Sequence, residues 1–181
     1  INTVLNELES AEQLPSGFKV SLNIFPCDVE QGNVLSLPKI TGLMQSKFVI
    51  CLEITEDEYL DSTIAHGYFK TLIESGFRLS LDDFGTGYSN LKNLHNLSFH
   101  QLKIDRSFVQ DIATEGLKAS MIPNIMELVH KFGYTCVAEG IETTEQEVIL
   151  KEAGVHYGQG WKYGRPMPIL EFKEYIARSI K

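Results

Sequence analysis

Short runs of apolar and β-branched residues alternate along the chain with longer stretches in which apolar residues recur at helical spacing. A strand buried on both faces reads as a continuous apolar run, whereas a helix packed on one side repeats about every 3.6 residues. The alternation therefore predicts an α/β fold of strand–helix units around a parallel sheet. The predicted strands are Lys19–Phe25, Phe48–Ile54, Phe77–Leu81, His100–Ile104, Tyr134–Ala138 and Val155–Gly158.

Helices are predicted between these strands and at both ends of the chain. Gly76, Gly133 and Gly154 stand where three of them should stop, because glycine tolerates the left-handed backbone that ends many helices. The stretch from 107 to 132 contains Gly116 and Pro123, so we expect a short turn followed by a helix with the proline near its first turn. The predicted helices are Asn2–Gln13, Leu35–Met44, Glu58–Ser75, Ser107–Phe132, Thr144–Ala153 and Ile169–Ser179.

A polar side chain stands at or near the end of each apolar run, and successive ones lie between 20 and 36 residues apart. This spacing is about one strand–helix unit. In a closed or nearly closed parallel barrel such strand ends converge on one face, where TIM-barrel active sites are found. Taken singly, each carboxylate is better explained as the N-cap of the following helix, but five coincident cases favour a shared site. The series is Asn23, Glu53, Asp82 with Asp83, Lys103, Glu139 and Gln159.

The adjacent acids Asp82 and Asp83 are the strongest part of this series, because two neighbouring residues can hardly both be helix caps. Carboxylates gathered in one place repel one another unless cations neutralise them. Oxygen ligands favour Mg²⁺ or Mn²⁺. With Asp82 bridging two ions and Asp83 binding one, the pattern predicts a two-metal site suited to displacement at phosphorus.

The segment FGTG, formed by Phe84, Gly85, Thr86 and Gly87, follows the doublet directly. Taken alone, two glycines at this spacing indicate only a flexible turn. Beside metal-binding acids, we expect the segment to be a mobile active-site loop whose glycines let the backbone approach a ligand closely.

Lys103 has two interpretations that the sequence leaves open. It would be a salt-bridge partner of Asp105 or Glu139 in the mouth of the barrel. Beside metal ions, it would instead orient water or balance the charge of a phosphoryl transition state.

The composition narrows the classes of function. The chain has 181 residues, 43% of them hydrophobic, which is ordinary for one globular domain. With 16 basic and 24 acidic residues, the formal charge of −8 argues against DNA or RNA polymers and anionic membranes as partners. No stretch has the length of a transmembrane helix, so we expect no membrane insertion by this segment.

The three cysteines are widely spaced and form no CxxC pair. Their number and spacing disfavour both a disulfide framework and a thiolate zinc site, and favour a reducing, cytoplasmic location. Cys51 and Cys136 lie within apolar runs, so we interpret them as small core residues.

Six motifs follow one another in order through nearly the whole chain and together resemble one known family, the EAL-domain cyclic di-GMP phosphodiesterases. The resemblance implies a TIM-type (β/α) barrel and attack of metal-bound hydroxide on cyclic di-GMP, which opens it to linear pGpG. The motifs are SLN at Ser21–Asn23, LEITE at Leu52–Glu56, LDDFGTGYSNL at Leu81–Leu91, LKIDRSFV at Leu102–Val109, VAEGIET at Val137–Thr143 and YGQGWKYGRPMP at Tyr157–Pro168.

The resemblance also implies a role for each matching residue. Asn23, Glu53 and Asp82 are similar to the ligands of a first metal, and Asp82, Asp83 and Glu139 to those of a second. Lys103 is similar to the catalytic lysine that holds the attacking water, with Glu139 beside it. The positions expected to support the loop, the second metal or the substrate pocket are Glu56, Asp105, Glu142 and Gln159.

One departure from the family lies at the front of the chain, where no Glu-Ala-Leu motif precedes Asn23. We therefore expect residues 1–181 to form a single EAL-like domain that lacks its first strands and has about six barrel strands. Whether this chain hydrolyses cyclic di-GMP on its own is left open by the sequence. An open barrel exposes two sheet edges, which favours a homodimer. Fused sensory or GGDEF-type domains, and a membrane anchor elsewhere in the parent protein, are compatible with the family.

Two other functions compete with hydrolysis. A non-catalytic module that binds cyclic di-GMP for regulation would not need the complete set Asp82, Asp83, Lys103 and Glu139. A metal-dependent barrel of the enolase kind, with a lysine base facing Mg²⁺, gives no role to the acidic doublet and its loop.

Overall fold

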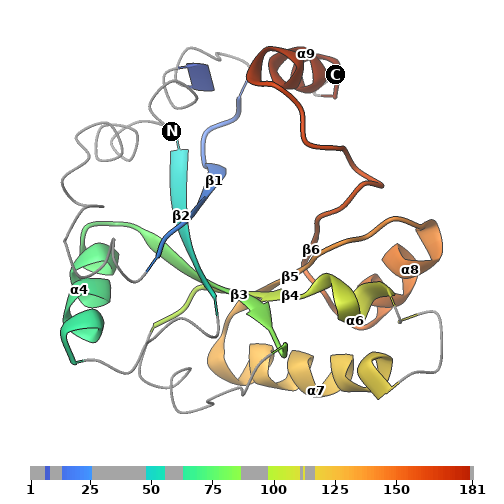
Figure 1. Cartoon of the computed structure of the whole chain (residues 1–181), viewed down its shortest axis with the longest axis horizontal. Helices are drawn as coiled ribbons and strands as arrows, with labels where there is room; N and C mark the ends of the chain where they lie inside the picture. The colour runs from blue at the N-terminus through green and yellow to red at the C-terminus, as the bar shows by residue number, and fades with distance from the viewer. Residues whose placement is uncertain are drawn as a thin grey trace.

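Six parallel strands form one curled sheet in the computed structural model, which describes residues 7–8, 14–25, 48–55, 63–86, 98–110, 112 and 117–179. Neighbours along the chain are neighbours in the sheet, and all five pairs are parallel. Figure 1 shows the strands curling into part of a barrel with helices on its outer side. The predicted incomplete TIM-type barrel of about six strands is confirmed. The strands are β1 (Phe18–Asn23), β2 (Phe48–Thr55), β3 (Arg78–Phe84), β4 (Gln101–Ile104), β5 (Thr135–Ala138) and β6 (Tyr157–Gly158).

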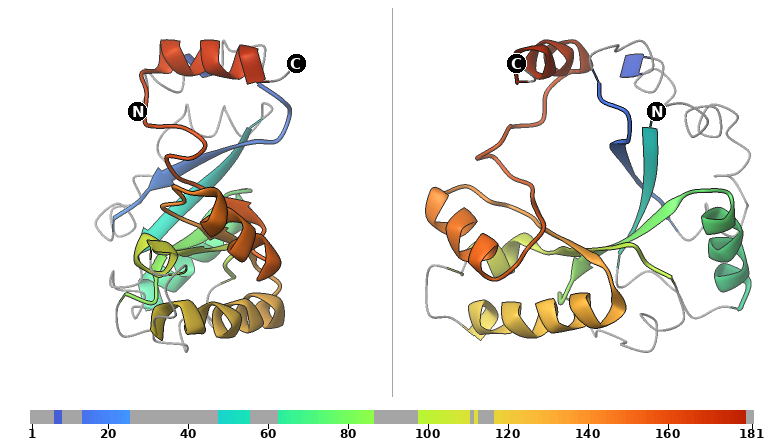
Figure 2. Two further views of the ribbon diagram at one scale, coloured as in Figure 1. Left: turned by 90° about the vertical axis from the view of Figure 1, so that its right-hand side faces the viewer. Right: turned by 180° about the vertical axis from the view of Figure 1, so that it is seen from behind.

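The helices connect the strands and cover the sheet, as Figure 1 and the two views of Figure 2 show. The C-terminal helix lies beside the first strand, because the ring of Phe172 packs 6.2 Å from that of Phe18. Lys173 of the same helix forms a 2.6 Å ion pair with Glu7. The helices with defined bounds are α4 (Thr63–Glu74), α6 (Arg106–Gln110), α7 (Leu117–Phe132), α8 (Thr144–Glu152) and α9 (Ile169–Ser179).

The predicted helix ends agree with the structure at all three glycines. Gly76, Gly133 and Gly154 have φ angles of 97°, 68° and 87°, the left-handed region expected after a helix C-terminus. The prediction for Pro123 was wrong in detail. It lies inside α7, beyond the first turn, because the helix begins directly after Gly116.

Three strand boundaries differ from the prediction by two residues or more. β1 ends at Asn23 rather than at Phe25. β3 continues through Asp82 and Asp83 to Phe84, so the acidic doublet lies within the strand rather than after it. β6 is limited to Tyr157 and Gly158. The predicted helix Leu35–Met44 lies outside the described residues, and of Asn2–Gln13 only residues 7 and 8 are described.

The hydrophobic core lies between the outer face of the sheet and the helices. Leu52, Leu79 and Leu102 are fully buried there, together with Leu72 of α4 and Val129 of α7. Burial of one such side chain stabilises a protein by about 1.5–3 kcal/mol. This layer therefore holds the strands in the curved arrangement on which the site depends.

Strand alternation sends the polar residues to the opposite, inner face. Glu53 lies between the buried Leu52 and Ile54, and Lys103 lies between the buried Leu102 and Ile104. Because successive side chains in a strand point to opposite faces, both polar side chains point into the barrel.

Cys51 and Cys136 are buried free thiols, which confirms their interpretation as core residues. Burial raises the pKa of the Cys51 thiol to about 11 and that of Cys136 to about 12. None of the helices in the described ranges has the length and hydropathy needed to cross a bilayer.

Candidate active site

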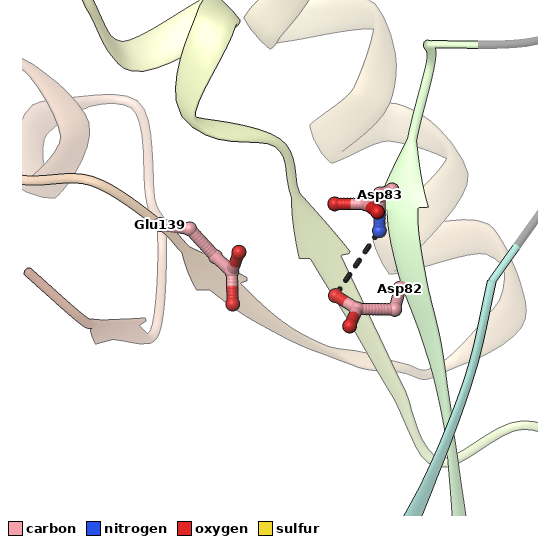
Figure 3. Close-up of side chains that lie close together, drawn as sticks. All are labelled: Asp82, Asp83 and Glu139. Atoms are coloured by element: carbon pink, nitrogen blue, oxygen red, sulfur yellow. Dashed lines mark hydrogen bonds between the residues drawn. The ribbon is translucent and has the colours of Figure 1, made fainter. Parts of the chain in front are cut away.

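Asp82 and Asp83 lie at an irregularity in strand pairing. Leu81 of β3 pairs with Leu102 of β4, but Phe84 pairs with Ile104, so β3 uses one residue more than its partner over this interval. Such a bulge disturbs the alternation of side chains. Asp83 takes the left-handed φ of 53°, and its amide donates to Asp82 Oδ1 at 3.1 Å. Both carboxylates consequently lie on the side of the strand that faces Glu139, as Figure 3 shows.

Asp82, Asp83 and Glu139 form a compact acidic cluster at the carboxyl ends of β3 and β5. One carboxylate oxygen from each lies within 4.8 Å of the other two. Burial and then the negative charge of Asp82 raise the pKa of Asp83. Burial also raises the pKa of Glu139, although Lys103 opposes that shift. The cluster therefore has the charge and the hard oxygen donors that a divalent cation requires.

Lys103 stands among three carboxylates from three different strands. Its Nζ lies 3.0 Å from Glu53 Oε2, 2.9 Å from Asp82 Oδ1 and 2.6 Å from Glu139 Oε1. Burial by itself lowers the pKa of Lys103, but the hydrogen bond to Glu139 and the charge of Glu53 raise it above its ordinary value. In this arrangement the Lys103 ammonium group donates hydrogen bonds to the carboxylates around it.

The turn after the doublet is held by Asp83 itself. The carbonyl of Asp83 accepts hydrogen bonds from the amide of Thr86 at 3.3 Å and from its hydroxyl at 2.9 Å. Gly85 has a φ of 93°, and a Cβ on it would lie 2.6 Å from the Phe108 ring. Phe84 was expected in the loop but is the last residue of β3 and is buried in the core. The turn thus begins one residue later than predicted.

The other predicted site residues lie around this centre. Asn23 ends β1 in register with Glu53, which places it on the same inner face. The Asp105 carboxylate accepts the amide of Ser107 at 2.9 Å and so also caps α6. Gln159 extends the pairing of β6, because its amide donates to the Ala138 carbonyl at 2.9 Å. Glu56 and Gly87 lie outside the described residues.

A cavity of about 700 Å³ opens beside Glu139. Its wall contains residues that sequence reasoning did not select, including Arg106, Trp161 and Arg165, together with the predicted Glu142 and Gln159. The guanidinium of Arg165 lies 4.5 Å from the centre of the Trp161 ring, which is 57% exposed. One signal in the sequence could have indicated these cavity residues, namely the chain's single tryptophan within a glycine-rich segment.

The family model described as EAL domain matches residues 1–166. The chain belongs to the EAL-domain family. Cyclic di-GMP phosphodiesterase PdeL of Escherichia coli (strain K12), a relative of this EAL chain, is 35% identical over 170 residues, or 92% of this chain and 47% of PdeL. The first eight curated relatives are longer than this chain, which spans between 16% and 47% of their length.

Solved structures of EAL proteins resemble this EAL chain in fold. One is the EAL enzyme Bd1971 in its cAMP and cyclic di-GMP bound form, with a TM-score of 0.82 and 29% identity over 96% of this chain and 47% of that one. Another is the manganese and cyclic di-GMP complex of Klebsiella pneumoniae BlrP1. Its TM-score is 0.76, with 26% identity over 91% of this chain and 42% of that one.

Proposed function

We propose that this EAL chain carries the site at which cyclic di-GMP is hydrolysed to linear pGpG. The observation that carries the proposal is the convergence of Asp82, Asp83 and Glu139, two of which contact the ammonium group of Lys103. The named activity of PdeL and the cyclic di-GMP bound to Bd1971 support the same substrate.

The acidic cluster fits Mg²⁺ or Mn²⁺. One ion would be held by Asp82, Asp83 and Glu139. A second ion would be held by Asn23, Glu53 and Asp82. When bound, such ions polarise the phosphodiester and lower the pKa of a coordinated water. The manganese named for BlrP1 supports this choice of metal.

Lys103 would act as a cation. Its ammonium group lies among the acidic side chains of the site, where it would donate a hydrogen bond to the attacking water or to a phosphoryl oxygen. Addition of one water to one phosphodiester breaks one P–O bond and opens the ring. The product is a linear dinucleotide with one terminal phosphate.

The cavity beside Glu139 would receive the part of the dinucleotide that does not react. Its volume of about 700 Å³ falls within the range of small-ligand sites. Arg106 and Arg165 supply positive charge near the second phosphate, and Trp161 supplies a face for a base.

Product analysis of the intact protein tests this proposal. With cyclic di-GMP and Mn²⁺, we expect pGpG to accumulate, and removal of the metal with EDTA should stop the reaction. Binding of cyclic di-GMP without pGpG would support the alternative, a regulatory binding module. Absence of both binding and turnover would contradict the proposed substrate.

Three further expectations about the protein stay predictions. They are fusion to sensory or GGDEF-type domains, formation of a homodimer, and a cytoplasmic location of this domain.

A further inference from the structure

Gln146 is a buried amide whose side chain joins two segments of the proposed site. Only 8% of the residue is exposed. Its Oε1 accepts the backbone amide of Glu142 at 2.8 Å and that of Thr143 at 3.0 Å. Its Nε2 donates to the carbonyl of Val109 at 3.2 Å.

Only part of this network is explained by helix capping. Thr143 and Gln146 form a capping box at the start of α8, in which the third residue of the helix must supply an acceptor. Either Glu or Gln can supply it. The bond to Val109 additionally requires a donor, which an ionised carboxylate lacks. The side-chain amide of Gln146 therefore has a second role besides capping α8, which is to bind the backbone of α6.

The two segments that Gln146 joins follow different residues of the proposed site. Val109 belongs to α6, which follows β4 and Lys103, whereas Glu142 belongs to the loop that follows Glu139. The same segments also touch where a Cβ on Gly140 would lie 2.6 Å from the Cβ of Arg106. Gln146 therefore ties the chain that follows Lys103 to the chain that follows Glu139.

We propose that Gln146 is a positioning residue that holds the Glu139–Glu142 loop against α6 and thereby sets the affinity of the acidic cluster for a divalent cation. The inference rests on the proposed metal site but names a residue outside the cluster. Residues that hydrogen-bond directly to metal ligands change metal affinity by about 10–100-fold when they are removed. Gln146 acts through the backbone of the loop, so we expect an effect at the lower end of that range.

Mn²⁺ titration by calorimetry, with a melting temperature recorded for each protein, tests this role. Gln146→Met keeps the buried volume but removes all three bonds, and we expect its Mn²⁺ affinity to fall about tenfold. Thr143→Ala is the matched control, because it weakens the same helix cap without touching the bond to Val109. It should lower the melting temperature and leave Mn²⁺ affinity unchanged.

Gln146→Glu at pH 8 separates the bonds to the loop from the bond to α6. Its carboxylate still accepts from the amides of Glu142 and Thr143 but cannot donate to the Val109 carbonyl. Reduced Mn²⁺ affinity in a folded Gln146→Glu protein supports the tie to α6. Affinity equal to wild type in either folded Gln146 variant overturns the inference. Absence of Mn²⁺ binding to the wild-type protein would overturn the metal site itself, a result distinct from failure of Gln146 alone.

Discussion

Lys103 Nζ and Glu139 Oε1 lie 2.6 Å apart, which joins β4 to the residue directly after β5 at the centre of the barrel mouth. The same ammonium group contacts Glu53 and Asp82. This ammonium group therefore offsets part of the repulsion among three carboxylates, and its removal should affect both stability and chemistry.

Replacement of Lys103 by Met should destabilise the fold at neutral pH. The variant leaves Glu53, Asp82 and Glu139 without their common counter-charge, and breaking a buried ion pair costs about 3–5 kcal/mol. Urea unfolding of wild type and variant measures the loss. Added Mn²⁺ should restore part of it, because a cation again neutralises the cluster. Equal stability of the two proteins without metal would contradict the compensating role.

Asp82→Asn should remove activity with only a modest loss of stability. The asparagine keeps nearly the same volume and an oxygen that accepts hydrogen bonds from the Asp83 amide and Lys103, and Lys103 keeps its ion pairs with Glu53 and Glu139. We expect turnover of cyclic di-GMP to fall by at least about 100-fold, the scale for loss of one group that stabilises the transition state. Glu145→Gln on the exposed first turn of α8 is the control for loss of one negative charge. Comparable turnover in Asp82→Asn and wild type would argue against metal binding by Asp82.

Gly85→Ala should destabilise the turn that follows the acidic doublet. A methyl group there meets the Phe108 ring at 2.6 Å, and the φ of 93° is unfavourable for alanine. We expect a loss of about 1–3 kcal/mol in the free energy of unfolding. Gly67→Ala in α4 is the matched control, because nothing lies within 4 Å of its Cβ position. It should stabilise the helix by about 0.5–1 kcal/mol. A similar effect of both substitutions would refute the steric argument.

His100 should make stability depend on pH on the acid side of neutrality. Its Nδ1 accepts the amide of Leu79 at 3.4 Å, which requires the neutral ring. Burial and the charge of Arg78 lower its pKa below the ordinary 6.5. The unfolded chain therefore binds the proton more tightly, so the contribution of His100 is complete above about pH 6.5 and declines as the pH falls.

His100→Gln isolates this contribution, because glutamine offers an acceptor that does not titrate in this range. Urea unfolding at pH 7 and pH 5.5 should show a larger loss of stability on acidification in wild type than in the variant. An equal loss in both proteins would assign the pH dependence to other groups.

The sequence by itself determined the order and type of the elements. Hydrophobic periodicity predicted all six strands, and glycines marked the ends of three helices, because these signals act over a few neighbouring residues. It also predicted that Glu53, Asp82, Lys103 and Glu139 share one face, since strand ends converge in any parallel barrel.

Only the tertiary structure decided how those residues meet. The bulge that turns Asp83 toward Glu139 depends on pairing between β3 and β4. The position of Lys103 among three carboxylates depends on the curvature of the sheet, and the tie from Gln146 to Val109 joins residues 37 positions apart. Contacts of this kind leave no periodic signal in the chain, because they form only when the core layer brings distant strands and helices together.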